Sequence, residues 1–150
     1  LVLGIGFSWG ILMAWSAITN ELTLIPLVLF STSIIWIIAY DSLYAMIDRE
    51  DDLSIGIKSS AILFGNKAHL IIGTLMFFTV LGFCLFGSLL DFGSFYYIGV
   101  MFCFLLFIYQ LKLISNKKKE NYFKAFLNNN WVGLALFTGT VLETAPWAAL

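Results

Sequence analysis

The sequence predicts an all-α integral membrane protein, a multi-span bundle of about five transmembrane helices. Its composition is 61% hydrophobic and only 11% charged, whereas soluble domains average roughly 45 to 50% apolar and 25% charged residues. Mean hydropathy is +0.95. Five apolar stretches are long enough, or nearly so, to cross a hydrocarbon core that needs about 20 helical residues. They cover approximately residues 1–19, 22–47, 68–90, 93–114 and 131–150.

The positions of the charged residues support this count and predict an orientation. With five spans, the loops at 48–67 and 112–130 lie on one side of the membrane and contain every basic residue: Arg49, Lys58, Lys67, Lys112, Lys117, Lys118, Lys119 and Lys124. The opposite side receives Glu21, Asp91 and Glu143. Because basic loops stay in the cytoplasm, we expect residues 48–67 to be cytoplasmic. A net charge of −1 argues against a nucleic-acid partner.

The first span begins within an apolar run that does not start with Met and has no basic segment and no small-residue cleavage site. We therefore expect it to be a membrane helix of a longer protein and not a signal peptide. Gly6 and Gly10 match the G-x-x-x-G pattern, in which small residues let two helices approach closely. The pattern predicts a helix-packing face.

The second span leads into an unusual acidic segment, residues 40–65, which reads YDSLYAMIDREDDLSIGIKSSAILFG. Carboxylates are costly near a membrane core, at roughly 2.5 to 3.5 kcal/mol each at the centre of a span, so a cluster of them calls for a reason. If the helix continues through this segment, four residues share one face, at i, i+3, i+7 and i+11: Asp41, Tyr44, Asp48 and Asp52.

Asp48 and Asp52 are then one helical turn apart, about 6 Å along the axis. Mg²⁺ is commonly held by one or two carboxylates together with water and substrate phosphates, so this pair is a candidate magnesium site. A solvated acidic turn between two membrane helices is the alternative. An EF-hand loop is excluded, because Leu53 stands where the loop needs Gly and Ser59 stands where it needs Glu.

A short amphipathic turn is expected after the acidic segment. Ser59 or Ser60 can cap residues 61–64 at the amino end, and Gly65 ends the turn. Such a segment would lie at the membrane interface and could cover the site. By its position alone, Lys58 is either an interfacial lysine or a cation beside a bound anion.

The third and fourth spans, at 68–90 and 93–114, contain no embedded charge, and Cys84 and Cys103 are expected to be core thiols. His69 is interpreted as a polar residue at the interface. The stretch at 112–130 is basic and then amphipathic, as expected for a cytoplasmic loop attracted to anionic lipid.

The acidic segment, written Y-D-x-x-Y-A-x-x-D-R-x-D-D-x-x-x-G-I-K-S-x-A-I-L-F-G, closely resembles the second Asp-rich motif of the UbiA superfamily of intramembrane prenyltransferases. Within that superfamily it is most similar to the 4-hydroxybenzoate polyprenyltransferases of ubiquinone synthesis. The runs G-F-x-W-G near the start and F-K-A-F-L-N-N-N-W-V-G near the end also resemble these enzymes. The resemblance therefore extends to about Thr140.

The resemblance implies Mg²⁺-dependent transfer of a polyprenyl group from polyprenyl diphosphate to 4-hydroxybenzoate, in a membrane protein of the bacterial inner membrane. It makes Asp48 and Asp52 the metal-binding, catalytic aspartates and Lys58 the lysine beside the diphosphate. Asp41 and Tyr44 would line the substrate site, whereas Glu50 and Asp51 project elsewhere and are expected to be solvated.

The family's first Asp-rich motif, N-D-x-x-D-x-x-x-D, does not occur in this sequence. We therefore expect residues 1–150 to be the carboxyl-terminal part of a single transmembrane prenyltransferase domain, inactive when alone. Two alternatives remain open: a superfamily member of the haem O or menaquinone pathways, and a non-catalytic, cation-binding half of a transporter.

Overall fold

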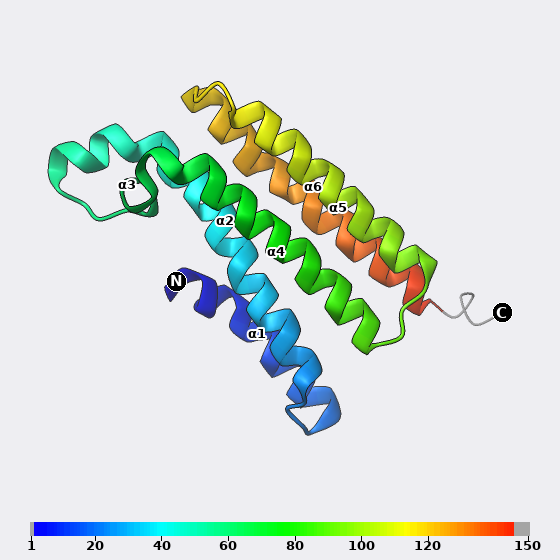
Figure 1. Cartoon of the computed structure of the whole chain (residues 1–150). Coiled ribbons are helices and arrows are strands. Elements are labelled where there is room, and N and C mark those ends of the chain that lie inside the picture. Colours follow the sequence, from blue (N-terminus) through cyan, green and yellow to red (C-terminus); the bar gives the residue numbers. More distant parts are fainter. Residues whose placement is uncertain (1, 146–150) are drawn as a thin grey trace.

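The computed structural model describes residues 2–145, which form five long helices, one short helix and a 3-10 turn (Figure 1). In chain order these are α1 (Val2–Thr19), α2 (Leu24–Ile55), α3 (Ser60–Phe64), η1 (Gly65–Lys67), α4 (Ala68–Leu89), α5 (Ser94–Ile114) and α6 (Lys119–Thr144). Four helical segments are long and apolar enough to cross a membrane, and they contain α1, α2, α4 and α5. The all-helical fold class and the first four spans are confirmed.

The start of the last helix was predicted incorrectly. We expected a loop at 112–130 and a span at 131–150. Helix α5 ends at Ile114, as expected for the fourth span, but α6 already begins at Lys119. Only a short turn separates them, in which Lys117 has a left-handed φ of 58°. Lys, Glu and Asn lowered the apparent hydrophobicity of 119–130 without preventing a helix, and Glu120 in the first turn favours its start. Residues 146–150 of the expected span lie outside the described range.

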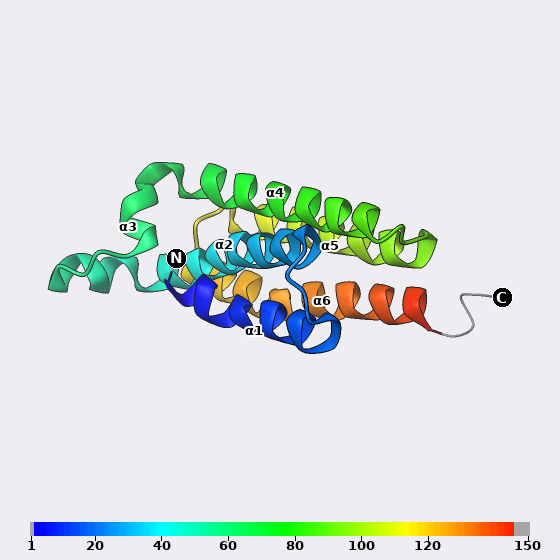
Figure 2. The ribbon, with the colours of Figure 1, turned by 90° about the horizontal axis from the view of Figure 1, so that it is seen from below.

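Helix α2 is the central element, because it packs against α1, α3, α4 and α6. Figure 2 shows α4 on the opposite side of α2 from α1 and α6. Among the described elements, α1 has α2 as its only helical neighbour, whereas α5 packs mainly along α6. One face of α2 between α1 and α6 is therefore left uncovered.

Two clusters of buried apolar side chains hold the helices together. The larger cluster joins α2, α4, α5 and α6, and its most deeply buried members include Leu43, Ile72, Met76, Cys103 and Val132. The smaller lies at the other end of α4 and α5, around Phe83 and Tyr96. The Tyr96 hydroxyl donates to the Phe83 carbonyl at 2.9 Å, which satisfies a polar group in an apolar interior. Cys103 is buried and Cys84 partly buried, both as free thiols, as expected.

Close helix contacts occur at glycines, but none of the described residues packs against the predicted G-x-x-x-G face. Gly6 and Gly10 are exposed, and a Cβ added to either would have no atom of residues 2–145 within 4 Å. Helix α1 instead contacts α2 through Gly4 and Ser8, which are one turn apart and buried. A Cβ on Gly4 would lie 3.3 Å from the Ile34 side chain. The small-x-x-x-small spacing is present, two residues earlier than expected.

The end of the bundle opposite the acidic segment is fixed by Glu143 of α6. Its Oε1 accepts from the Gly93 backbone N–H at 2.7 Å and its Oε2 from the Tyr96 N–H at 3.3 Å. These N–H groups belong to the start of α5, where amides lack partners within the helix. Glu143 therefore caps a neighbouring helix and lies at the same end as Asp91, as the charge distribution predicted.

Candidate functional site

The acidic segment is the last part of an unbroken helix. Helix α2 continues to Ile55 and ends at Gly56, whose left-handed φ of 75° suits glycine and whose N–H bonds to the Asp52 carbonyl. The predicted shared face is therefore confirmed for Asp41, Tyr44, Asp48 and Asp52. This helix also brings Asp48 and Asp52 one turn apart, with side chains that can approach each other.

Burial divides the carboxylates of this segment into two groups. Asp41, Asp48 and Asp52 are partly buried, whereas Glu50 and Asp51 are exposed. This division follows the helical period and agrees with the expectation that Glu50 and Asp51 are solvated. The Tyr44 side chain is 44% exposed. It lies on the same helical face as Asp48, one turn before it.

A groove between α2 and α6 runs along α2 from Ser33 to Tyr40 and ends next to Asp41. It has a volume of about 540 Å³, and Trp36, Tyr40 and Phe126 form much of its wall. The Tyr40 and Tyr44 rings both meet Phe126 edge to face, with centroids 6.0 and 5.2 Å away. Tyr44 thus extends the aromatic wall of the groove toward Asp48.

The Trp36 side chain is held by a hydrogen bond that the sequence did not reveal. Its Nε1–H donates to Asn129 Oδ1 at 2.9 Å, and Asn129 Nδ2 donates to the carbonyls of Ala125 and Phe126. Asn129 is only 8% exposed. Asn129 lies in a run of three asparagines that we assigned to a loop. Because this run was assigned to a loop, a buried asparagine amide on a helix was not predicted.

The segment after α2 agrees with the expected interfacial turn. Ser59 precedes α3 with extended backbone angles but forms no side-chain cap, and Gly65 ends α3 with a φ of 51°. Ala61 is fully buried and Leu63 is 82% exposed, so α3 is amphipathic. Lys58 is exposed and forms no ion pair with another residue in the described range 2–145.

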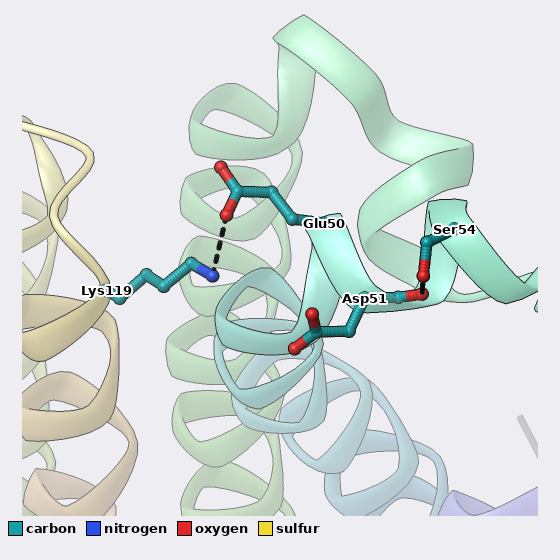
Figure 3. Close-up of polar contacts among 4 residues, drawn as sticks. All are labelled: Glu50, Asp51, Ser54 and Lys119. Atoms are coloured by element: carbon teal, nitrogen blue, oxygen red, sulfur yellow. Dashed lines mark hydrogen bonds and ion pairs between the residues drawn. The ribbon is translucent and has the colours of Figure 1, made fainter.

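One ion pair joins the acidic segment to α6 and was not predicted. Glu50 Oε2 lies 2.8 Å from Lys119 Nζ, and both side chains point into the space between the two helices (Figure 3). Asp51 takes no part in this ion pair, and its backbone carbonyl accepts from the Ser54 hydroxyl at 2.7 Å. These residues follow the apolar part of α2, at its polar end. The hydrogen bond from Lys119 lowers the pKa of Glu50, and the bond to Glu50 raises the pKa of Lys119.

The arrangement of carboxylates limits how a metal could bind. No group of three or more His, Cys, Asp or Glu side chains with metal-binding geometry occurs among the described residues. Asp48 and Asp52 alone suit Mg²⁺, which keeps several waters and takes only one or two protein carboxylates when substrate phosphates complete its shell. Asp48 and Asp52 therefore remain the candidate ligands for one side of a magnesium site.

Known bacterial proteins are similar in sequence to almost the whole chain. The chain is 48% identical over 145 residues to the 4-hydroxybenzoate octaprenyltransferase of Marinobacter nauticus, an alignment that covers 97% of the chain and 49% of that relative. It is 51% identical over 143 residues to the protein of the same name from Providencia stuartii, covering 95% of the chain and 50% of the relative. The chain thus spans about half the length of these relatives.

No solved structure gave a significant match. The pattern of the UbiA prenyltransferase family matches residues 1–140, which include the acidic segment and all of α1 to α5. The chain therefore belongs to the UbiA prenyltransferase family.

Proposed function

We propose that this chain forms the carboxyl-terminal half of an enzyme that transfers a polyprenyl group from polyprenyl diphosphate to 4-hydroxybenzoate, in ubiquinone biosynthesis. The single observation that supports it best is the unbroken α2 helix, which presents Asp48 and Asp52 one turn apart beside an aromatic groove. Relatives named 4-hydroxybenzoate octaprenyltransferase are about half identical over nearly the whole chain. The missing half would supply the first Asp-rich motif.

In this proposal Asp48 and Asp52 hold Mg²⁺ from one side. Bound there, Mg²⁺ would neutralise the charge that develops on the departing diphosphate. The exposed Lys58 would add positive charge beside the same diphosphate. Asp41 and Tyr44 lie on the same helical face and would line the substrate site.

The aromatic residues of the groove, next to the aspartates, would protect the reactive carbon of the prenyl donor. Tyr40, Tyr44 and Phe126 form an aromatic wall, and aromatic faces attract cations at about 0.5 to 2 kcal/mol. An apolar wall also excludes water, which would otherwise capture an allylic cation before the aromatic acceptor does. Membership of a prenyltransferase family favours this chemistry over ion transport. The resemblance in the acidic segment favours 4-hydroxybenzoate over the haem O and menaquinone pathways.

We also propose that the enzyme lies in the bacterial inner membrane with the acidic segment at the cytoplasmic side. The ends of α2 and α5 and the starts of α4 and α6 lie at one end of the bundle (Figure 1). All eight basic residues belong to this end, which favours the cytoplasmic side. Soluble 4-hydroxybenzoate would then reach the site from the cytoplasm.

The test uses a chimera in which this chain replaces the carboxyl-terminal half of the Marinobacter nauticus relative. Membranes containing it are supplied with Mg²⁺, octaprenyl diphosphate and labelled 4-hydroxybenzoate, and the prenylated product is measured. We expect product from the chimera and a loss of at least about a hundredfold in the Asp48→Ala and Asp52→Ala variants, because charge stabilisation at a departing group contributes on that scale. Asp51→Ala is the matched control and should retain activity. Full activity in both test variants would reject the site.

A further inference from the structure

The groove between α2 and α6 has one end near the aspartates and another end farther from them. Because the two helices are antiparallel, Tyr40 faces Phe126 near the aspartates. Trp36 lies beside Gly133 farther from them, and Ser33 lines the groove one turn beyond Trp36. Trp36 precedes Asp48 by about 18 Å of helix, at 1.5 Å per residue. A molecule held at Asp48 by its diphosphate and continuing along the groove would therefore reach Trp36 only if its chain were long.

The chemistry of the groove favours a hydrocarbon chain. The amide of Asn129 is already used, since its oxygen accepts from Trp36 and its nitrogen donates to two backbone carbonyls. No charged side chain of the described residues lines the groove, so nothing in this lining would balance the carboxylate of an aromatic acid. Unsaturated hydrocarbon, in contrast, can pack on the rings of Trp36, Tyr40 and Phe126.

Gly133, unlike Gly139 of the same helix, has room for a side chain. A Cβ on Gly139 would lie 3.1 Å from the Gly99 Cα and the Phe95 carbonyl, so helix packing requires a glycine there. A Cβ on Gly133 would meet only the Trp36 ring, at an ordinary 3.5 Å, and no other atom of the described residues within 4 Å. Packing among the described residues therefore does not require a glycine at 133. The need to keep the end of the groove open would account for it.

The Trp36 ring is held by contacts on several sides. Its Nε1–H is bonded to Asn129, and the ring meets Tyr40 and Phe83 edge to face at 6.1 and 6.0 Å. A ring held on several sides makes a wall of constant position, which is what discrimination by size needs.

We propose that Trp36 and Gly133 form the far end of the donor groove and determine which prenyl chain lengths bind well. Asn129 acts through Trp36 and is a positioning residue. This inference rests on the proposed function, because it requires a prenyl diphosphate held at Asp48 and Asp52.

The test adds Gly133→Ala and Gly133→Leu to the chimera and measures KM and kcat with geranyl, farnesyl and octaprenyl diphosphates. Leu at 133 would fill the far end, so we expect KM for octaprenyl diphosphate to rise at least about tenfold more than KM for geranyl diphosphate. Ala should give a smaller change in the same direction. Gly73→Leu is the matched control, because a Cβ there also meets one side chain at 3.5 Å, in a groove between α4 and α5.

The outcomes separate this inference from the proposed function. A graded, length-dependent rise in KM through Ala and Leu at 133, with no such rise for Gly73→Leu, supports it. An equal loss for every donor, or an unchanged KM ratio, overturns it while leaving prenyl transfer intact. No product from the unsubstituted chimera would reject the proposed function, and the chain-length role with it.

Discussion

The carboxylates of the acidic segment differ in their surroundings although they are near neighbours in the sequence. Asp48 and Asp52 are partly buried beside Tyr44, whereas Glu50 and Asp51 are exposed. Helical periodicity alone predicts this division, because it depends only on α2 continuing past the apolar run. The partners of single residues could not be predicted in this way. The bonds of Glu50 to Lys119 and of Trp36 to Asn129 join distant parts of the chain.

The Trp36–Asn129 hydrogen bond should contribute measurably to stability. Asn129→Leu keeps a similar volume but leaves the Trp36 N–H without an acceptor, and an unpaired buried donor costs about 1 to 3 kcal/mol. We therefore expect a lower free energy of unfolding for Asn129→Leu in detergent, measured by titration with a denaturing detergent. In Trp36→Phe, which removes the donor, the further change to Asn129→Leu should cost less. Equal costs in both backgrounds would show that the bond contributes nothing.

The Glu50–Lys119 pair should affect titration more than stability. Lys119 holds the pKa of Glu50 below its usual 4.5, and Glu50 holds the pKa of Lys119 above its usual 10.5. The contribution of Glu50 is therefore lost as pH falls through its lowered pKa, and that of Lys119 is lost as pH rises through its raised one. Between these limits the pair stays ionised. Both side chains are exposed, so salt screens the attraction and no change in Tm is expected for Lys119→Gln.

NMR can follow this pair directly. With the Glu50 carboxyl carbon labelled, the titration midpoint should lie below 4.5 in the parent chain and move upward in Lys119→Gln. Lys124→Gln is the control, since it removes the same charge from the same helix without touching the pair. An identical Glu50 midpoint in all three proteins would contradict the contact.

At the scale of the helix, the close packing of α5 on α6 depends on glycines, whereas Gly6 of α1 has no such role among the described residues. A Cβ on Gly99 would lie 2.8 Å from the Ala135 carbonyl and 3.1 Å from the Gly139 Cα. These are backbone atoms, which cannot move without separating the two helices. A Cβ on Gly6 of α1 would have no atom of the described residues within 4 Å. Gly99→Ala should therefore destabilise the bundle by about 1 to 3 kcal/mol, as overpacking does.

Gly6→Ala is the matched control, and it should be neutral or slightly stabilising because Ala favours a helix over Gly by up to about 1 kcal/mol. Thermal unfolding followed by circular dichroism in detergent would compare the two variants. Equal Tm values for both would show that the α5–α6 contact tolerates a methyl group.

The helices themselves show where sequence patterns succeed and where they fail. Long apolar runs predicted the ends of α1, α4 and α5 to within two residues. They do so because the length of an apolar run sets the length of the helix that crosses the membrane. The start of α6 was missed because its first turns are polar and basic. The glycines at the helix contacts were not predicted. G-x-x-x-G spacing indicates that a helix can pack closely, but the position of the partner helix determines which of its small residues form the contact.

The whole bundle is asymmetric in the way half of a larger domain would be. The described part of α1 packs on α2 alone, and the face of α2 between α1 and α6 is open along the groove. The other half of the proposed enzyme would cover this face. Its contacts cannot be predicted from this chain, since the residues that would complete the site belong to another segment.

The orientation of the bundle yields a test that needs no activity. Lys67 and Lys118 lie at the acidic end, and Glu21 and Ser94 at the opposite end, all exposed. If basic residues mark the cytoplasmic side, Lys67→Cys and Lys118→Cys should react with a membrane-impermeant maleimide only in inverted bacterial inner-membrane vesicles. Glu21→Cys and Ser94→Cys should react only in right-side-out vesicles.

The parent chain is the control for this labelling, because Cys103 is buried and Cys84 lies within α4, partly buried. Neither thiol should react in either type of vesicle. Labelling of all four introduced cysteines from the same side would contradict antiparallel spans. The opposite pattern of labelling would place Asp48 and Asp52 away from the cytoplasm, and 4-hydroxybenzoate would then have to cross the membrane before it met the donor.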